Sequence, residues 1–230
     1  MSTINTELEH ICTWFIANKL SVNLKKSNYI LLGSKPRSND SSLHSVLLNG
    51  TILERVTYTK FLGILIDQNL DWKQHTSHIA LKVSKSLGIL NRIKALLSTE
   101  LLKTLYYTMI HPYFVYCILI WGGGSKLAIN KLSCLQKRAV RILTHSSFRA
   151  HTNPLFLRLQ ILKLPDLYHL QLGIFMFKAK YHLLTSSSSH YVQFTKINPR
   201  FDFRKKFDFQ PLVFKTQIRY KYIGITGSKF

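Results

Sequence analysis

The sequence is poor in acidic residues. Its 230 residues include 10 aspartates and glutamates against 32 lysines and arginines, which gives a formal net charge of +22. The excess is concentrated after residue 101, where 20 basic residues accompany 3 acidic ones. A positive field attracts polyanions, and each phosphate that it neutralises releases counterions. We therefore expect a nucleic-acid partner, with an anionic membrane surface or a ribosome-like assembly as the alternatives.

Cysteine is also scarce. The three cysteines, Cys12, Cys117 and Cys134, lie far apart and form no Cys-x-x-Cys pair. This spacing favours reduced core thiols in an intracellular protein, in the cytoplasm or the nucleus. The first ten residues contain neither a basic nor an apolar segment, so no signal peptide is predicted.

No apolar run has the length of a membrane span. The most apolar segment, residues 105–124, is interrupted by His111-Pro112. The ten residues 112–121 that remain continuous fall short of the roughly 20 that a bilayer requires. We expect a buried helix over 112–121, and a membrane-associated protein is only a third hypothesis.

Residues 1–70 have the pattern of a small unit with one helix and largely antiparallel strands. The helix is predicted over 8–17, with Asn18 as a left-handed stop. Strands are predicted over 29–32 and 61–66, and Asn49-Gly50 between two apolar runs is a strong hairpin signal. Four apolar residues are expected on one face of the helix: Leu8, Ile11, Trp14 and Phe15.

Gly63 interrupts the predicted strand 61–66, which indicates a bulge or the close approach of a backbone or a ligand. Beyond that strand, Asp71 followed by Gln74 resembles the start of a helix with a capping box.

The pattern from residue 71 onward is helical. Helices are predicted up to about residue 97 and over 99–110, 112–121, 127–143, 154–162 and 165–184. In the first of these, the apolar positions recur every three or four residues: Ile79, Val83, Leu87, Leu90, Ile93 and Leu97. In the helix 127–143, Leu132, Leu135, Ala139 and Ile142 are expected to face inward.

Both of these helices also carry a basic face. Lys82, Lys85 and Arg92 line the first, and Lys131, Arg138 and Arg141 line the helix 127–143. Such faces are usually only solvated, but the net charge favours contact with nucleic acid.

Residues 186–189 are all serine and are predicted to be a linker. From residue 201, aromatic and basic residues alternate, which suits extended structure that stacks on bases beside phosphate contacts. Core strands with exposed basic residues would show the same pattern. The expected organisation is therefore 1–70, 71–185 and 186–230.

Three other patterns have structural explanations. The segment from Gly122 to Lys126 lacks the residue order of a Walker loop and is predicted to be a turn between helices. His75 and His78 lack further metal ligands at a suitable spacing, which favours solvated or capping roles. Asp67 and Asp71 are expected to serve a turn and a helix N-cap rather than a two-metal site. We therefore predict no metal site.

The order of these segments resembles the end of the reverse transcriptase of non-LTR retrotransposons, particularly the jockey-like and CR1-like lineages. The resemblance covers roughly residues 8–185. It begins with Trp14, the segment Asn18-Lys19-Leu20-Ser21-Val22-Asn23 and Lys26-Ser27, which look like polymerase motif D, although Ser27 stands where threonine is usual.

Two later groups continue the resemblance. Asn49-Gly50, Phe61-Leu62-Gly63-Ile64, Asp67, Leu70, Trp72 and His75 look like the primer-grip hairpin and the entry to the thumb. Tyr116, Trp121, Leu135-Gln136-Lys137-Arg138-Ala139 and Arg141-Ile142 resemble the thumb and connecting region.

The resemblance implies an α+β fragment of an RNA-directed DNA polymerase. It would contain a partial palm with a small antiparallel sheet, an all-helical thumb-like bundle and a basic extended tail. In this family the metal-binding Asp-Asp pair precedes motif D and would fall upstream of Met1. The fragment itself would then bind no cofactor and hold no small-molecule substrate, with Mg²⁺ expected for the full-length parent. We expect it to be inactive alone.

The implied partners are an RNA template and a DNA primer, or an RNA/DNA hybrid. Lys26 would lie near the incoming nucleotide, and Phe61, Leu62 and Gly63 would press on the primer terminus. The six basic residues named above would follow the template–primer backbone. A non-catalytic basic nucleic-acid-binding module is the alternative function.

Overall fold

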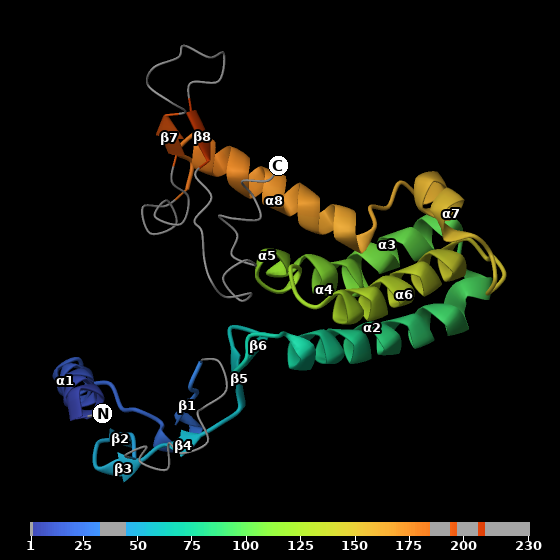
Figure 1. Ribbon diagram of the computed structural model, residues 1–230. Helices are drawn as coiled ribbons and strands as arrows, with labels where there is room; N and C mark the ends of the chain where they lie inside the picture. The colour runs from blue at the N-terminus through green and yellow to red at the C-terminus, as the bar shows by residue number, and fades with distance from the viewer. Residues whose placement is uncertain (1, 33–44, 185–193, 197–206, 210–230) are drawn as a thin grey trace. The chain divides into compact units, whose positions relative to one another are not determined.

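The computed structural model describes residues 2–32, 45–184, 194–196 and 207–209. Its contacts divide the chain into two compact units, residues 1–74 and 75–230 (Figure 1).

In its described residues, the first unit combines one α-helix and one 3-10 helix with three short pairs of strands. The pair β2–β3 and the pair β5–β6 are antiparallel, whereas β1 and β4 pair in parallel. The expected combination of a small β-containing segment and helices is confirmed. Its elements are α1 (Ser2–Ala17), η1 (Leu24–Lys26), β1 (Asn28–Tyr29), β2 (Leu47–Leu48), β3 (Thr51–Ile52), β4 (Glu54–Arg55), β5 (Tyr58–Phe61) and β6 (Ile64–Asp67).

Helix α1 packs on a small core at β2 and β3. Leu8 and Cys12 contact a buried cluster of Val46, Leu48 and Leu53. The apolar face of the helix is only partly covered, because Ile11 and Trp14 are 45% and 58% exposed. The left-handed residue after the helix is Lys19, with φ of 55°, rather than Asn18, whose side chain donates to the carbonyl of Trp14.

Two hairpins in this unit turn through two residues with positive φ. Asn49 and Gly50, with φ of 51° and 71°, form the predicted turn between β2 and β3. The predicted continuous strand 61–66 is wrong, because Leu62 and Gly63, with φ of 45° and 85°, reverse the chain between β5 and β6. Gly63 therefore serves a turn of the type that matches strand twist, and not a bulge.

The second unit is helical in residues 75–184. The helix α2 begins two residues before the division, and the others follow in short succession. The elements are α2 (Lys73–Ile93), η2 (Lys94–Leu96), α3 (Thr99–Met109), α4 (His111–Val115), α5 (Ile118–Trp121), α6 (Lys126–Leu143), α7 (Thr152–Leu159) and α8 (Leu164–Lys180). The predicted helices therefore exist, with shifted ends, except for the one over 112–121.

That helix is replaced by α4 and α5, which meet at Cys117 in a left-handed conformation with φ of 50°. The indole N–H of Trp121 donates to the carbonyl of Tyr116 across the break, at 2.8 Å. The glycines 122–124 form the predicted turn, and Ser125 then caps α6 by accepting a hydrogen bond from the N–H of Ala128 at 3.3 Å. No helix in the described part of the chain has the length and apolar character to cross a membrane.

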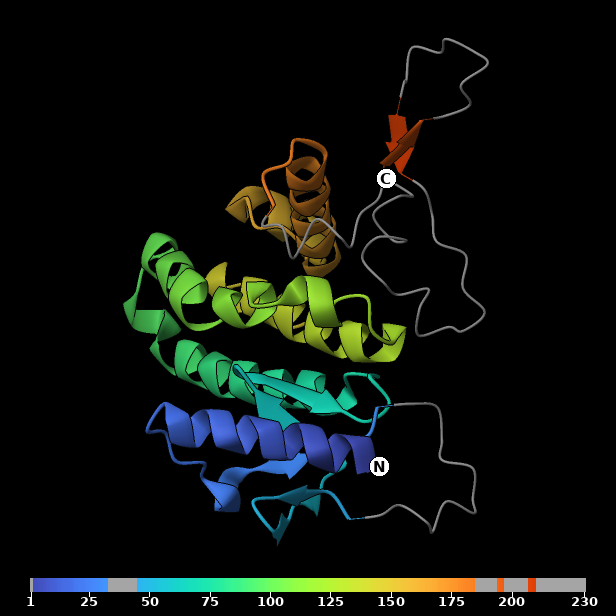
Figure 2. The ribbon, with the colours of Figure 1, turned by 90° about the vertical axis from the view of Figure 1, so that its left-hand side faces the viewer.

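The core of this unit is mainly apolar. The predicted stripe on α2 is buried at Ile79, Val83, Leu87 and Leu90. Helix α6 packs against α3, α7 and α8, and Figure 2 shows α8 crossing the direction of α3 and α6. The largest fully buried side chains include Trp121, Tyr106, Phe114, Leu102, Leu132 and Leu172.

One buried polar side chain, Gln136 of α6, joins three segments of the core. Its Nε2 donates to the hydroxyl of Tyr106 at 3.0 Å and to the carbonyl of Leu162 at 2.8 Å. Its Oε1 accepts from the N–H of Leu164 at 2.8 Å. Burial raises the pKa of Tyr106 to about 12, so the hydroxyl stays neutral. Gln136 thus ties α3 and the start of α8 to α6 without any charge.

Beyond residue 184, the strands β7 (Phe194–Lys196) and β8 (Phe207–Phe209) pair antiparallel. The predicted linker 186–189 and the rest of the predicted basic aromatic tail lie outside the described residues.

Replacing Gln136 tests its role in the core. We expect Gln136→Leu to lower the free energy of unfolding by about 2 to 4 kcal/mol, because the hydroxyl of Tyr106 and two main-chain groups lose their partner. Urea denaturation is the measurement, with Lys137→Ala, an exposed neighbour, as the control. Equal stability of the two variants would contradict this assignment.

Candidate nucleic-acid interface

The tip of the β5–β6 hairpin presents apolar side chains to solvent. Phe61 and Leu62 are 60% and 74% exposed, and Gly63 is exposed beside them. Four residue pairs of the ladder, from Phe61 with Ile64 to Tyr58 with Asp67, fix the position of the tip. The three residues predicted to touch a primer are therefore together on a preformed turn.

Lys26 lies in the same unit, at the end of η1, and is exposed. The segment that follows it is attached to the base of the hairpin. The hydroxyl of Thr59 donates to the Oδ1 of Asn28 at 3.1 Å, and the N–H of Val56 donates to the carbonyl of Tyr29 at 2.9 Å. These contacts link the chain carrying Lys26 to the strand that carries the tip.

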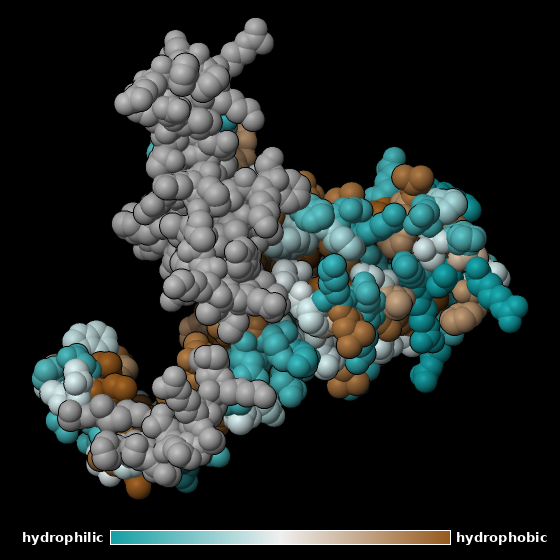
Figure 3. Space-filling view, viewed as in Figure 1, coloured by the Kyte–Doolittle hydropathy of each residue, from teal (hydrophilic) through white to brown (hydrophobic). Residues whose placement is uncertain are grey.

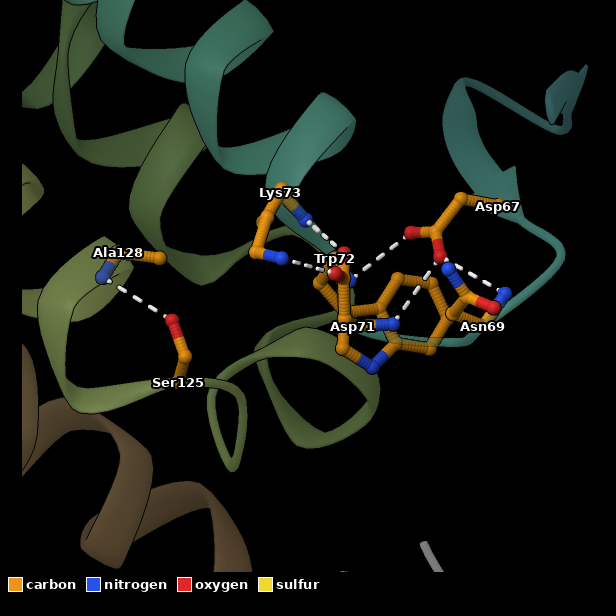
Figure 4. Close-up of polar contacts among 7 residues, drawn as sticks. All are labelled: Asp67, Asn69, Asp71, Trp72, Lys73, Ser125 and Ala128. Carbon is orange, nitrogen blue, oxygen red and sulfur yellow. Dashed lines mark hydrogen bonds and ion pairs between the residues drawn. The ribbon is translucent and has the colours of Figure 1, made fainter. Parts of the chain in front are cut away.

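The carboxylate of Asp67 organises the loop after β6 (Figure 4). It is buried and accepts three main-chain hydrogen bonds: from Asn69 and Asp71 at 3.1 Å each and from Trp72 at 2.9 Å. The same loop holds Leu70 and Trp72 at positive φ values of 52° and 63°. The predicted turn role of Asp67 is thus observed.

Asp71 acts at the start of α2. Its Oδ1 accepts from the N–H of Lys73 at 3.0 Å, and its Oδ2 lies 2.7 Å from the ammonium of Lys73. The hydrogen bond from the ammonium to this carboxylate and the negative charge of Asp71 raise the pKa of Lys73. The carboxylates of Asp67 and Asp71 are therefore both engaged in hydrogen bonds or an ion pair within the chain. In the part of the chain that the structure describes, no group of three potential ligands could hold a metal ion.

His75 does not have the solvated role expected for it. It is 3% exposed, and its ring lies edge-to-face against Trp121 with 5.8 Å between centroids. Burial, with a smaller contribution from the charge of His78, lowers the pKa of His75 to about 4.

The basic face of α2 is solvent-exposed. Lys82, Lys85 and Arg92 are all exposed, and the buried positions such as Val83 and Leu87 lie on the other side of the helix. From Lys82 to Arg92 the face extends about 15 Å along the helix axis. On the face of the helical residues that it shows, Figure 3 has many hydrophilic side chains among scattered hydrophobic ones.

The three basic residues of α6 differ from one another. Lys131 and Arg138 are exposed, whereas Arg141 is half-buried and its Nε donates to the carbonyl of Ala150 at 3.0 Å. The guanidinium of Arg141 also lies 5.9 Å from the ring centre of Phe148. Nothing in the sequence singles out Phe148, and Gln136 is notable only as part of the segment that resembles the thumb and connecting region.

The charge of the helical residues is strongly one-sided. Residues 75–184 contain 15 lysines and arginines and 2 acids, and no acid occurs between Glu100 and Asp166. Within this described range neither acid forms an ion pair with a basic side chain. The positive charge is therefore available to an external anion.

Sequence comparison identifies relatives among retrotransposon proteins. No family model and no solved structure matches the chain. A probable RNA-directed DNA polymerase from transposon BS of Drosophila melanogaster is 31% identical over 101 residues, or 42% of this chain and 11% of that protein. The RNA-directed DNA polymerase from mobile element jockey of Drosophila funebris is 21% identical over 156 residues, which are 66% of this chain and 17% of that protein.

A probable RNA-directed DNA polymerase from transposon X-element of Drosophila melanogaster is 26% identical over 136 residues, or 57% of this chain and 14% of the relative. The chain thus spans 11 to 17% of the length of these three relatives. Over part of its length it is a distant homologue of the reverse transcriptases of non-LTR retrotransposons. Within that class, its relatives include the polymerases of jockey, X-element and BS.

The buried His75 predicts a pH-dependent stability. Its pKa is about 4 in the fold and about 6.5 when unfolded. The unfolded chain therefore binds more protons between these values, and the free energy of unfolding falls as the pH drops from about 6.5 toward 4. Urea titrations across this range measure the effect. We expect His75→Phe, which keeps an aromatic ring against Trp121, to flatten the profile, and an unchanged slope would refute the assignment.

Proposed function

We propose that this chain is the nucleic-acid-binding part of a retrotransposon reverse transcriptase. The observation that carries the proposal is the acid-free stretch between Glu100 and Asp166, with nine basic residues, in a chain homologous to such polymerases. Residues 1–70 would be a partial palm, 71–185 the thumb and connecting region, and 186–230 a basic tail. The template–primer, as an RNA/DNA hybrid or an RNA template with a DNA primer, is the proposed partner.

The helical residues would hold the sugar-phosphate backbone. Lys82 and Lys85 lie one helical turn apart on an exposed face of α2, and Arg92 continues the line. Lys131 and Arg138 offer a second set of exposed charges on α6. Such contacts position a duplex without reading its sequence, which suits a protein that must move along its template.

The first unit would act at the primer terminus. Phe61 and Leu62 project from a hairpin tip whose backbone is fixed by the β5–β6 ladder, and apolar side chains there could pack on the terminal sugar and base. Lys26 is exposed on a segment that is hydrogen-bonded to the same strands. Its ammonium is the proposed proton donor to the departing pyrophosphate.

We also propose that the isolated chain does not catalyse nucleotide addition. Two-metal phosphoryl transfer requires carboxylates with free oxygens that converge on the ions. Asp67 uses both oxygens on three main-chain N–H groups, and Asp71 caps α2 and pairs with Lys73. These residues do not fit a Mg²⁺ site, because binding the ion would disrupt the loop that leads into α2.

Binding of a primer–template duplex, measured against salt, tests the proposed interface. We expect a linear fall of log K with log salt concentration, steeper by about 0.9 for each phosphate contacted. The double variant Lys82→Gln/Lys85→Gln should reduce the slope by about 1 to 2. The control is Lys178→Gln/Lys180→Gln, which removes the same charge from α8 and should change the slope less. A flat slope for the unmodified chain would exclude the proposed function.

An equal reduction of the salt slope in the two double variants would show that the duplex is attracted by the net charge alone and not by the α2 face. Tighter binding to anionic lipid vesicles than to the duplex would instead favour the membrane surface.

A primer-extension assay tests the proposed inactivity. We expect no templated synthesis by the 230-residue chain with Mg²⁺ or Mn²⁺, because Asp67 and Asp71 are engaged in the fold. Robust extension that survives purification and is lost in Asp67→Asn would show that the chain holds a catalytic site.

A further inference from the structure

Phe148 is an exposed aromatic residue on a loop between α6 and α7. Its side chain is 82% exposed, the largest value among the exposed aromatic side chains in the described residues. A single exposed ring is common on protein surfaces and means little alone. Phe148 differs from such isolated rings because hydrogen bonds fix the loop that carries it.

Four hydrogen bonds fix the loop that carries Phe148. The Nε of Arg141 donates to the carbonyl of Ala150 at 3.0 Å, and the N–H of Ser146 donates to the carbonyl of Arg141 at 3.0 Å. The hydroxyls of Thr144 and Ser146 lie 2.8 Å apart, and the N–H of Ala150 donates to the carbonyl of Ser147 at 3.1 Å. The loop is therefore ordered before any ligand arrives, which lowers the entropic cost of binding.

Arg141 also contacts the ring itself. Its guanidinium carbon lies 5.9 Å from the ring centre of Phe148, within the range of a cation–π interaction. The same side chain therefore holds both the backbone of the loop and its aromatic ring. This explains why Arg141 is half-buried while Arg138, one turn earlier on α6, is exposed.

The surroundings of the ring are cationic. Arg149 follows it in the chain and is exposed, Arg138 lies one helical turn from Arg141, and no acid occurs between residues 100 and 166. An aromatic face beside several fixed or exposed cations suits a planar group joined to phosphates. This combination is how proteins bind single-stranded nucleic acid, whose bases are free to stack.

We infer that Phe148, held by Arg141, is a stacking platform for an unpaired base, with Arg149 and Arg138 on the adjoining phosphates. This inference rests on the proposed nucleic-acid-binding function and adds a separate site for single-stranded template or primer. A protein partner is disfavoured because the residues on either side of Phe148 in the chain, Ser147 and Arg149, are exposed and polar or charged and add no apolar area to the ring.

The test is the affinity of the full chain for single-stranded 12-nucleotide DNA and RNA, compared with a blunt duplex, by fluorescence anisotropy. Phe148→Ala should weaken binding to the single strands roughly 5- to 150-fold, the effect of losing one base-stacking contact. Binding to the duplex should stay the same. The slope of log K against log salt should also stay the same, because no charge is removed.

Arg149→Gln provides the complementary variant. This variant should lower the slope of log K against log salt concentration by about 0.7 for single strands, which is the contribution of one phosphate contact. Leu127→Ala is the matched control, since Leu127 is an apolar residue on α6 that is 84% exposed. It should bind single strands like the unmodified chain.

Phe148→Trp separates stacking from a general apolar contact. It should retain the affinity for single strands, and fluorescence of the added tryptophan should be quenched by the bound base. Phe148→Ala with unchanged single-strand affinity, or with an equal loss on the duplex, would overturn the inference while the proposed function stands. A full chain that binds neither nucleic acid would overturn both.

Discussion

The helical residues must fold while carrying 15 basic side chains with only 2 acidic ones. This imbalance limits which interactions can hold the helices of residues 75–184 together. Ion pairs cannot hold the helices together, so the core depends on apolar side chains and on neutral hydrogen bonds such as those of Gln136. The charges remain on the surface, where mutual repulsion opposes the compact state until a polyanion or salt screens it.

In the first unit, only a few residues separate the β5–β6 hairpin from the start of α2. The carboxylate of Asp67 stabilises this short loop by accepting hydrogen bonds from three main-chain N–H groups. Its carboxylate is therefore a structural acceptor. The homology to retrotransposon polymerases and the engaged state of both aspartates fit a segment that binds and positions nucleic acid.

Much of the fold follows from local patterns. The three-to-four-residue spacing of Ile79, Val83, Leu87 and Leu90 predicted the inner face of α2, and Asn49-Gly50 predicted a hairpin. The second hairpin was missed because leucine rarely adopts the positive φ that Leu62 has. The break at Cys117 was missed for the same reason. The exposure of Trp14 depends on what packs against α1, which helical periodicity alone does not specify.

The candidate interface was predictable in part. Exposed lysines and arginines opposite an apolar stripe follow from periodicity, and Lys82, Lys85, Arg92, Lys131 and Arg138 are all exposed. The contacts of Arg141 with Ala150 and Phe148 required the structure, because they depend on how the loop after α6 folds back. The resemblance likewise included Gln136 without indicating that it is a core residue.

Lysine footprinting of the full chain, with and without a primer–template duplex, tests the central claim most directly. Acetylation rates report which ammonium groups the nucleic acid covers. We expect protection of Lys82, Lys85 and Lys131 and unchanged rates at Lys178 and Lys180 on α8. Uniform protection of all five, or protection confined to α8, would contradict it.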